Sequence, residues 1–282
     1  MSSARLASFR RLLAAALGTQ YYRPWLEAAG LHTPQLIQAL DSIEPALERF
    51  PPLKPEAFLM HREQFHNPAA PPPPPAQLFY PYRTMPRTAV LAEQFRSRRR
   101  LRVFPNGLGR RLVWFRPEAI AGPLAKLCKL AELVESGALK LRPLRDAVIV
   151  LTRIDQPPLS DADRERLWRC FQVPIYQQLL GFSGELLAWE CEAHEGLHIV
   201  TDDALFETQP IQGEPRVLAT SLVDLVHPLI RVMTGCRGRV GNGLCGCGQT
   251  GERLLLLSDE GCFTAVSDEA LQAEQPTEAV LS

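Results

Sequence analysis

The sequence has no excess of charge of either sign, no long apolar run and no dense set of cysteines. Lysine plus arginine equals aspartate plus glutamate, 31 of each among 282 residues, so the surface as a whole does not attract nucleic acid or an anionic membrane, although local patches stay open. No apolar stretch approaches the roughly 20 residues of a membrane span. Seven cysteines are too few in a chain of this length for a secreted disulfide framework. We therefore expect a cytoplasmic protein with reduced thiols that binds neither nucleic acid nor a membrane.

A secretory signal peptide is not expected either. Two arginines precede an apolar run over residues 12–17, as in such a peptide, but the run is short. Residues 21–25, which read YYRPW, stand where a cleavage site would need small residues.

The first 67 residues predict a segment of short helices. Apolar residues recur at helical spacing over residues 3–17, with Arg5 and Arg10 off the apolar face. Two further helices are expected, one from Pro24 to Gly30 and one over residues 34–50 before a pair of prolines. Hydrophobic residues make up 46% of the chain, enough for these helices to pack on a core.

Two stretches of biased composition follow. Residues 68–85 contain five consecutive prolines, which favour an extended chain outside any sheet and predict a linker. Residues 96–102 read RSRRRLR, and Arg110, Arg111 and Arg116 follow closely. Such a cluster fits either a contact to phosphate or RNA or a solvated basic surface, and the neutral charge of the chain favours the solvated surface.

Residues 86–180 predict one α/β unit. Residues 117–137 carry apolar residues at helical spacing, and residues 147–151 form a continuous apolar run that suits a parallel strand buried on both faces. Ser160 is placed to cap a following helix, and residues 173–176 fit the next strand. Strand, helix and strand in this order predict a parallel pair with a crossover helix.

Residues 181–266 predict a β-rich subdomain, because short extended runs alternate there with turn residues. A small barrel or a twisted sheet would fit this pattern. Residues 267–282 are acidic, contain a proline and predict a flexible tail. The expected fold class is therefore α/β, with N-terminal helices, a partial α/β sheet unit and a β-rich part.

Cys191, His198, Cys245 and Cys247 are the candidate metal ligands. Thiolate and imidazole are donors that zinc prefers, and three thiolates with one imidazole fill a tetrahedron without an open position, as in structural sites. The alternative is a set of buried, unligated cysteines, which behave as small apolar residues. His194 is a rival imidazole.

Cys236 and Cys262 are rival thiolates. Cys236 with His227 as its base is also the pair to test for a cysteine nucleophile, although core packing is the favoured interpretation. The four tryptophans are expected in the core rather than at a ligand site.

Five segments resemble, in the same order, motifs of the phenylacetate–CoA ligase-like family of adenylate-forming enzymes. Residues 189–198 read WECEAHEGLH and are similar to the family's EC…H-[DE]-G-L-H segment. Residues 228–235 (PLIRVMTG) resemble P-[LV]-I-R-Y-R-T-G, and residues 245–250 (CGCGQT) resemble C-P-C-G-R-T. Residues 158–166 and 21–30 are similar to its P-L-S-D-x-x-R-E-R and P-F-Y-R-x-x-F-x-x-A-G segments. Such enzymes activate a carboxylate with ATP and pass it to coenzyme A.

The chain departs from the family's pattern at positions that would handle ATP. No Ser/Thr/Gly-rich phosphate loop stands between the N-terminal helices and the α/β unit, where residues 71–75 are all proline. Cys236 replaces the aspartate that binds the ribose, and Glu185 stands one place after the position of the magnesium-binding glutamate. No lysine follows Lys140, so the lysine of the family's C-terminal lid has no counterpart. We therefore expect a truncated member without catalytic activity.

The resemblance implies that the four candidate ligands meet in space, in a zinc-stapled remnant of the enzyme's large domain. We expect a binding or assembly module that forms a homo-oligomer or joins a protein partner. The alternative is a divergent ATP-dependent acyl- or aryl-CoA ligase, or a binder of ATP, AMP or coenzyme A. It would use a residual pocket formed by Gly181, Phe182, Ser183, Glu185, Arg231 and Thr234.

Overall fold

Short helices form the N-terminal part of the chain. The computed structural model describes residues 3–73, 75–80, 84–105 and 108–257. The N-terminal helices are α1 (Ser3–Ala16), α2 (Arg23–Ala28), α3 (Pro34–Gln38), α4 (Glu44–Leu47), α5 (Pro55–Met60) and a 3-10 turn (Arg62–Phe65). The single helix predicted over residues 34–50 is wrong: it is divided into α3 and α4. Pro45 explains the division, because proline lacks an N–H group and is tolerated only in the first turn of a helix, where α4 holds it.

A parallel sheet section with helices on one face follows. Its strands are β1 (Thr88–Val90), β2 (Leu101–Val103), β3 (Ala119–Gly122), β4 (Val148–Arg153) and β5 (Ile175–Leu180). Its helices are α6 (Arg110–Phe115), α7 (Leu124–Glu135) and α8 (Asp161–Phe171). The predicted strand–helix–strand unit is confirmed, because β4 and β5 pair in parallel on either side of α8 in the chain. The Ser160 hydroxyl caps α8 by accepting a hydrogen bond from the Asp163 N–H at 3.1 Å.

The helix predicted over residues 117–137 begins later than expected. Residues 119–122 form β3, which is buried along its whole length between β1 and β4. Pro123 then occupies the position before the first turn of α7. The apolar run before Pro123 fits a short buried strand as well as a helix, and pairing with two neighbouring strands decides between them.

The second half of the chain is β-rich, as predicted. Its strands are β6 (Leu186–Glu190), β7 (Leu197–Ile199), β8 (Ala204–Ile211), β9 (Glu214–Ser221), β10 (Val232–Leu244) and β11 (Thr250–Leu256). Over the described residues they continue the parallel section as one eleven-stranded sheet, in the order β2-β1-β3-β4-β5-β6-β7-β11-β10-β9-β8. The boundary predicted at residue 180 thus falls between two paired strands of this sheet.

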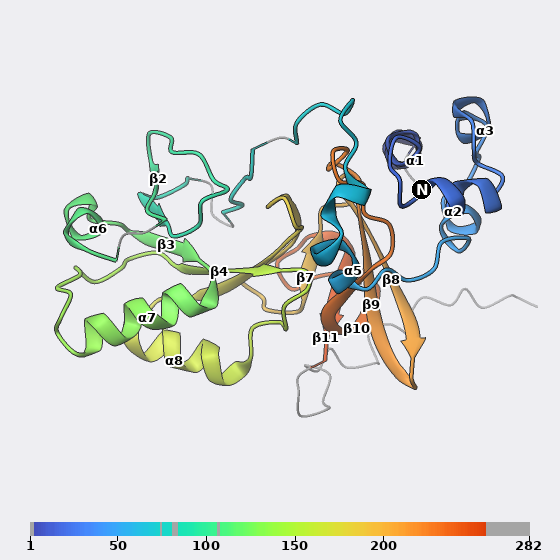
Figure 1. The fold of residues 1–282 in the computed structure, drawn as a ribbon. Helices are drawn as coiled ribbons and strands as arrows, with labels where there is room; N and C mark the ends of the chain where they lie inside the picture. The colour runs from blue at the N-terminus through green and yellow to red at the C-terminus, as the bar shows by residue number, and fades with distance from the viewer. Residues whose placement is uncertain (1–2, 74, 81–83, 106–107, 258–282) are drawn as a thin grey trace, which may run out of the picture.

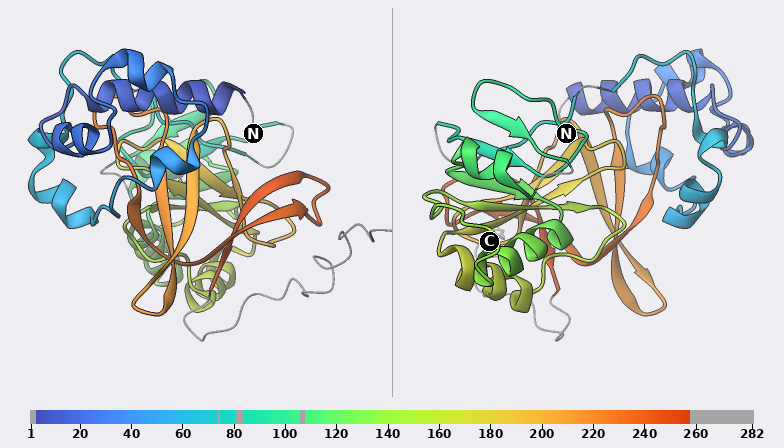
Figure 2. Two further views of the ribbon diagram at one scale, coloured as in Figure 1. Left: turned by 90° about the vertical axis from the view of Figure 1, so that its right-hand side faces the viewer. Right: turned by 60° about the vertical axis from the view of Figure 1, so that its left-hand side comes forward.

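Three large apolar cores and a small fourth cluster around Trp189 pack these layers together over the described residues. Helices α7 and α8 cover one face of the parallel section (Figure 1). Its other face is covered by extended chain, since Ala76, Leu78 and Phe95 pack on it with buried side chains. The N-terminal helices lie beside the antiparallel section, away from α7 and α8, in both views of Figure 2. The linker predicted at residues 68–85 therefore includes a stretch that covers one face of the parallel section.

Several single-residue expectations need correction. Arg5 lies on the buried side of α1, where its Nη1 is 2.8 Å from Glu252 Oε2 and its Nη2 donates to the Ala204 carbonyl. Trp189 is buried as predicted, but the other tryptophans are partly or largely exposed, Trp114 most of all at 82%. Within the described ranges no helix combines the length and apolarity needed to cross a bilayer. The tail predicted at residues 267–282 lies outside the described residues.

Candidate metal centre

The structure brings the four predicted ligands together at one end of the antiparallel section. Cys191 follows β6, His198 lies in β7, and Cys245 and Cys247 lie in the turn between β10 and β11. Strands β6, β7 and β11 are neighbours in the sheet. The ligand atoms of the four residues all lie within 4.8 Å of one another.

Two distances inside this cluster match the edges of a tetrahedral metal site. Cys191 Sγ is 3.6 Å from Cys245 Sγ, and Cys247 Sγ is 3.4 Å from His198 Nε2. Around zinc, sulfur at about 2.3 Å and nitrogen at about 2.0 Å place two sulfurs about 3.8 Å apart and a sulfur and a nitrogen about 3.5 Å apart. Donor types and spacing therefore both suit zinc.

The turn that carries two of the ligands is built by local hydrogen bonds. The Cys245 N–H donates to the Gln249 carbonyl, and the Gly248 N–H donates to the Cys245 carbonyl, both at 2.8 Å. Gly248 has a φ of +86°, in the left-handed region where glycine is favoured. This turn directs the two cysteine sulfurs to the same side.

Two charged side chains that the sequence analysis missed support the cluster. Glu195 Oε2 accepts hydrogen bonds from the Gly246 N–H at 2.9 Å and from Arg253 Nη1 at 3.2 Å. The Gly246 N–H lowers the pKa of Glu195. Arg253 also donates to the Leu244 carbonyl and so ties β11 to the turn. The available signal was an arginine directly before three consecutive leucines in β11.

Burial sets the protonation of the ligands. It raises the pKa of Cys191 to about 12 and also raises the pKa of Cys245. Burial, together with the nearby positive charge of Arg253, lowers the pKa of His198, whose ring stacks on Trp189 at 4.8 Å. A neutral imidazole is the form that binds a metal, and a bound cation is what stabilises buried thiolates.

The rival ligands are engaged elsewhere. His194 Nδ1 lies 2.9 Å from Glu190 Oε1, and its ring stacks on Tyr176. Cys236 is enclosed in the core, where burial raises the pKa of its thiol to about 11. The ring of His227 packs instead against Phe58 at 5.8 Å. Core packing of Cys236 is therefore the interpretation that the structure supports, and Cys262 lies outside the described residues.

Four of the six predicted pocket residues lie in and around a turn after β5. Gly181 begins this turn, Phe182 packs against Phe58 at 4.9 Å, and the Ser183 N–H donates to Glu185 Oε2 at 3.1 Å. The Ser183 hydroxyl donates to the carboxylate of Asp224. Glu185 is buried, and burial, with the charge of Asp224, raises its pKa to about 7.

The other two predicted pocket residues are held within the protein. Arg231 donates from Nη1 to the Phe50 carbonyl at 2.6 Å, and its Nε is 3.2 Å from Glu207 Oε2. The hydroxyl of Thr234 donates to the Val217 carbonyl at 2.9 Å. The charged and polar groups of both side chains are thus engaged in contacts between structural elements.

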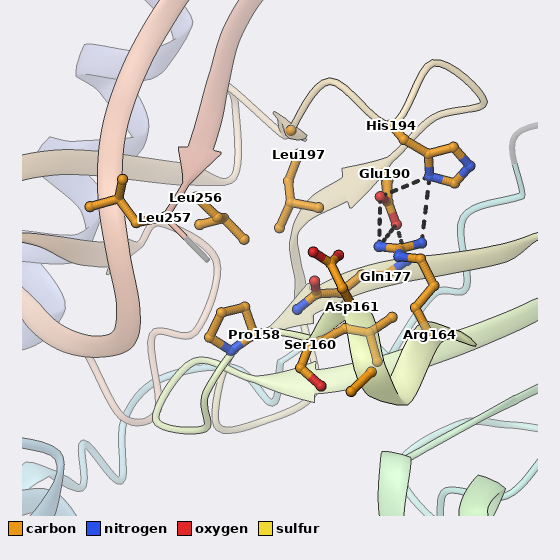
Figure 3. Close-up of a pocket in the computed structure, with 13 residues that line it drawn as sticks. Pro158, Ser160, Asp161, Arg164, Gln177, Glu190, His194, Leu197, Leu256 and Leu257 are labelled. Atoms are coloured by element: carbon orange, nitrogen blue, oxygen red, sulfur yellow. Dashed lines mark hydrogen bonds and ion pairs between the residues drawn. The ribbon is translucent and has the colours of Figure 1, made fainter. Parts of the chain in front are cut away.

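A cavity of about 440 Å³ lies between the start of α8, the ends of β6 and β11, and β7. Figure 3 shows Glu190, Arg164 and His194 at one end of it and Leu256 and Leu257 at the other. Arg164 Nη2 donates to both Glu190 oxygens at 2.9 and 3.1 Å, and the Gln177 N–H donates to Glu190 Oε2 at 2.8 Å, so the Glu190 carboxylate is engaged within the protein. The lining of this cavity includes neither the six predicted pocket residues nor the four metal ligands.

No protein-family model and no curated protein sequence matches the chain, but its fold is shared with solved structures. Structures of 2-hydroxyisobutyryl-CoA ligase match with TM-scores of 0.62 for an open conformation and 0.63 for the thioesterification state, both in complex with 2-HIB-AMP and CoA and both at 17% identity. They cover 88% and 89% of this chain, which spans 67% and 66% of theirs. A postadenylation state matches with a TM-score of 0.61 at 16% identity, over 93% of this chain and 68% of that one. The chain therefore shares the fold of about two thirds of 2-hydroxyisobutyryl-CoA ligase.

Proposed function

We propose that this protein is a catalytically inactive homologue of the adenylate-forming acid–CoA ligases, folded around a structural zinc ion, and that it acts as a binding or assembly module. The observation that carries the proposal is the cluster of three cysteines and one histidine with ligand atoms within 4.8 Å of one another. The shared ligase fold supports the homology.

The donor set supports a structural role for the metal. Cys191, His198, Cys245 and Cys247 would fill all four positions of a zinc tetrahedron, which leaves none for substrate or water. Zinc bound there neutralises thiolates and links strand ends. It would tie the end of β6 and strand β7 to the turn between β10 and β11, a connection across about fifty residues of chain.

The polar groups of the residual pocket support the absence of catalysis. A ligase needs free donors for phosphate and ribose, because charge that develops during adenylation must be stabilised. Arg231 is instead engaged with Phe50, Glu207 and Gln209. Cys236, at the position that the resemblance assigns to the ribose-binding aspartate, is fully buried. Within the chain, residues 71–75 offer prolines where a phosphate loop would need glycines.

Two adjacent exposed apolar side chains support the assembly part of the proposal. Leu59 and Met60 at the end of α5 are 51% and 68% exposed. Contiguous exposed apolar side chains often mark a contact with another protein. A second copy of the chain or a different protein would cover them.

The alternative is a residual binder of ATP, AMP or coenzyme A, or a divergent ligase. A cavity of about 440 Å³ lined by Glu185, Phe79 and Trp189 favours it, because a charged residue of the predicted pocket and two aromatic side chains line the same space. This cavity touches the turn in which four of the predicted pocket residues lie.

Calorimetry with ATP, AMP and coenzyme A, combined with elemental analysis and light scattering, separates the two candidates. We expect about one zinc per chain, no heat of nucleotide binding and a mass above that of a monomer. The Cys245→Ser variant should lose the zinc, whereas Cys128→Ser, a half-buried cysteine in α7, should keep it. Micromolar binding of any of the three ligands would overturn the inactive-module proposal in favour of the alternative. A strictly monomeric protein would contradict the homo-oligomer and leave a different partner as the assembly proposal.

A further inference from the structure

The arginine-rich stretch contrasts with the neutral chain that contains it. Residues 87–116 hold nine arginines, no lysine and one glutamate. Arg98, Arg99, Arg100 and Arg102 in this stretch are all exposed. An all-arginine surface favours planar, bidentate recognition of phosphate oxygens over a diffuse positive charge.

The topology of the parallel section gathers arginines from four segments into one row. Strands β2, β1, β3 and β4 are neighbours and run in the same direction, so the residues before them lie along the same end of the sheet. Exposed arginines stand directly before or within three residues of each strand. We call this set the arginine rim: Arg98, Arg99 and Arg100 before β2, Arg87 before β1, Arg116 before β3 and Arg145 before β4.

Backbone hydrogen bonds confirm that the segments of the rim touch. The Thr88 N–H donates to the Arg100 carbonyl at 2.8 Å, and the Glu118 N–H donates to the Arg87 carbonyl at 2.7 Å. The Arg145 N–H donates to the Glu118 carbonyl at 3.1 Å. Four neighbouring strands span about 15 Å, so the rim is a continuous strip rather than scattered charges.

Few negative charges neutralise the rim. Glu118 is 3.6 Å from Arg87, and this is the one ion pair recorded for rim arginines within the described residues. Asp146 lies beside Arg145 and is half-buried, and burial raises the pKa of its carboxyl. The rim therefore keeps a net positive charge on a protein whose total charge is zero.

An exposed aromatic ring stands beside the rim. Trp114 lies two residues before Arg116 in α6, and it is the most exposed tryptophan at 82%. Leu112 and Phe115 take the inner side of this helix, where Phe115 packs against Phe104 at 5.5 Å. Helix α6 lies at the β2 and β3 side of the sheet (Figure 1). The indole ring of Trp114 is thus left on the outer side of α6, away from the core.

We propose that the arginine rim and Trp114 form a binding surface for single-stranded nucleic acid. Guanidinium groups along a strip track a phosphate backbone, and an exposed indole offers a face on which a base stacks. This surface uses the amino ends of the parallel strands and is separate from the turn after β5 and from the metal centre. The solvated surface predicted from the sequence explains the arginines but leaves Trp114 without a role.

The test measures binding of a fluorescent 15-nucleotide oligo-dT and oligo-U to the full-length protein over a salt series. The wild type should bind both, with affinity that falls as salt rises. The Arg98→Gln/Arg99→Gln/Arg100→Gln variant should bind more weakly, and its salt slope should decrease by about two because each phosphate contact to a single strand contributes about 0.7. Trp114→Ala should weaken binding about tenfold with an unchanged salt slope, because it removes stacking and no charge.

The control variant carries Arg23→Gln, Arg166→Gln and Arg169→Gln, three exposed arginines elsewhere on the surface. It should bind as the wild type does. The proposal is overturned if the wild type does not bind, if the control loses as much affinity as the rim variant, or if Trp114→Ala has no effect. Equal binding of inorganic polyphosphate and oligonucleotide, or a preference for phosphatidylserine vesicles, would also overturn it. Circular dichroism of each variant and the single Arg99→Gln change distinguish lost contacts from misfolding.

Discussion

At the scale of single residues, the buried charged side chains of the predicted pocket are held by contacts within the protein. Glu185 and Asp224 are both buried, and the Ser183 hydroxyl connects the turn after β5 to Asp224. Arg231 is buried and donates hydrogen bonds to three acceptors of the protein instead of to water. The sequence identified Glu185 and Arg231 through the family resemblance, but it contained no sign of Asp224, since a lone aspartate in a loop is ordinarily exposed.

Glu185 predicts a specific dependence of stability on pH. Its pKa is raised to about 7 in the folded protein by burial first and by Asp224 second. Above its ordinary pKa of about 4.3 the unfolded chain releases this proton while the folded protein retains it, so the contribution of Glu185 to stability falls as pH rises from about 4.3 to 7 and stays low above that. Glu185→Gln should therefore match the wild type near pH 4 and be more stable at pH 8, by up to about 4 kcal/mol.

Denaturant unfolding of the Glu185→Gln variant and the wild type at pH 4, 6 and 8 measures this difference. Glu27→Gln, which changes an exposed glutamate in α2, is the control and should show no such trend. A constant difference between Glu185→Gln and the wild type at all three pH values would show that Glu185 does not retain a proton.

At the scale of elements, the sequence predicted helices and strands whose ends are set by neighbouring residues, and it missed those that depend on pairing with distant strands. Helix α8 was predicted well because its cap, Ser160, and its apolar spacing both lie in the neighbouring sequence. Strand β3 was assigned to a helix because only pairing with β1 and β4 distinguishes it. The division between α3 and α4 was not predicted, although Pro45 indicates that a new helix begins there.

Arg231 predicts how the N-terminal helices are attached to the sheet. Its guanidinium joins the Phe50 carbonyl, which follows α4 in the helical segment, to Glu207 and Gln209 of β8. Arg231→Met should lower the free energy of unfolding by about 3 kcal/mol, because it leaves the buried side of this network without its cation. Chemical denaturation measures the loss, and Arg62→Met in the exposed 3-10 turn is the control. An Arg231→Met protein as stable as the wild type would mean that this arginine is available for a ligand.

At the scale of the whole molecule, the fold is one sheet whose two halves carry different surfaces. The parallel half presents the arginine rim, and the antiparallel half holds the metal centre and the N-terminal helices. The α/β unit and the β-rich part were predictable from periodicity and from the family resemblance. Their fusion into one sheet was not, because β5 pairs with β6 through backbone groups that leave no pattern in the sequence. The metal centre was predictable as a residue set, whereas its supports, Glu195 and Arg253, depend on the turn conformation.

The most direct test of the zinc-centred account is thermal unfolding of the purified protein before and after treatment with a strong chelator, with zinc measured in both samples. We predict about one zinc per chain and a large fall in Tm when the chelator removes it, reversed by added zinc. The Cys247→Ser variant should unfold near the chelated Tm with or without chelator. A protein that folds without metal, at a Tm that the chelator leaves unchanged, would contradict the structural zinc site.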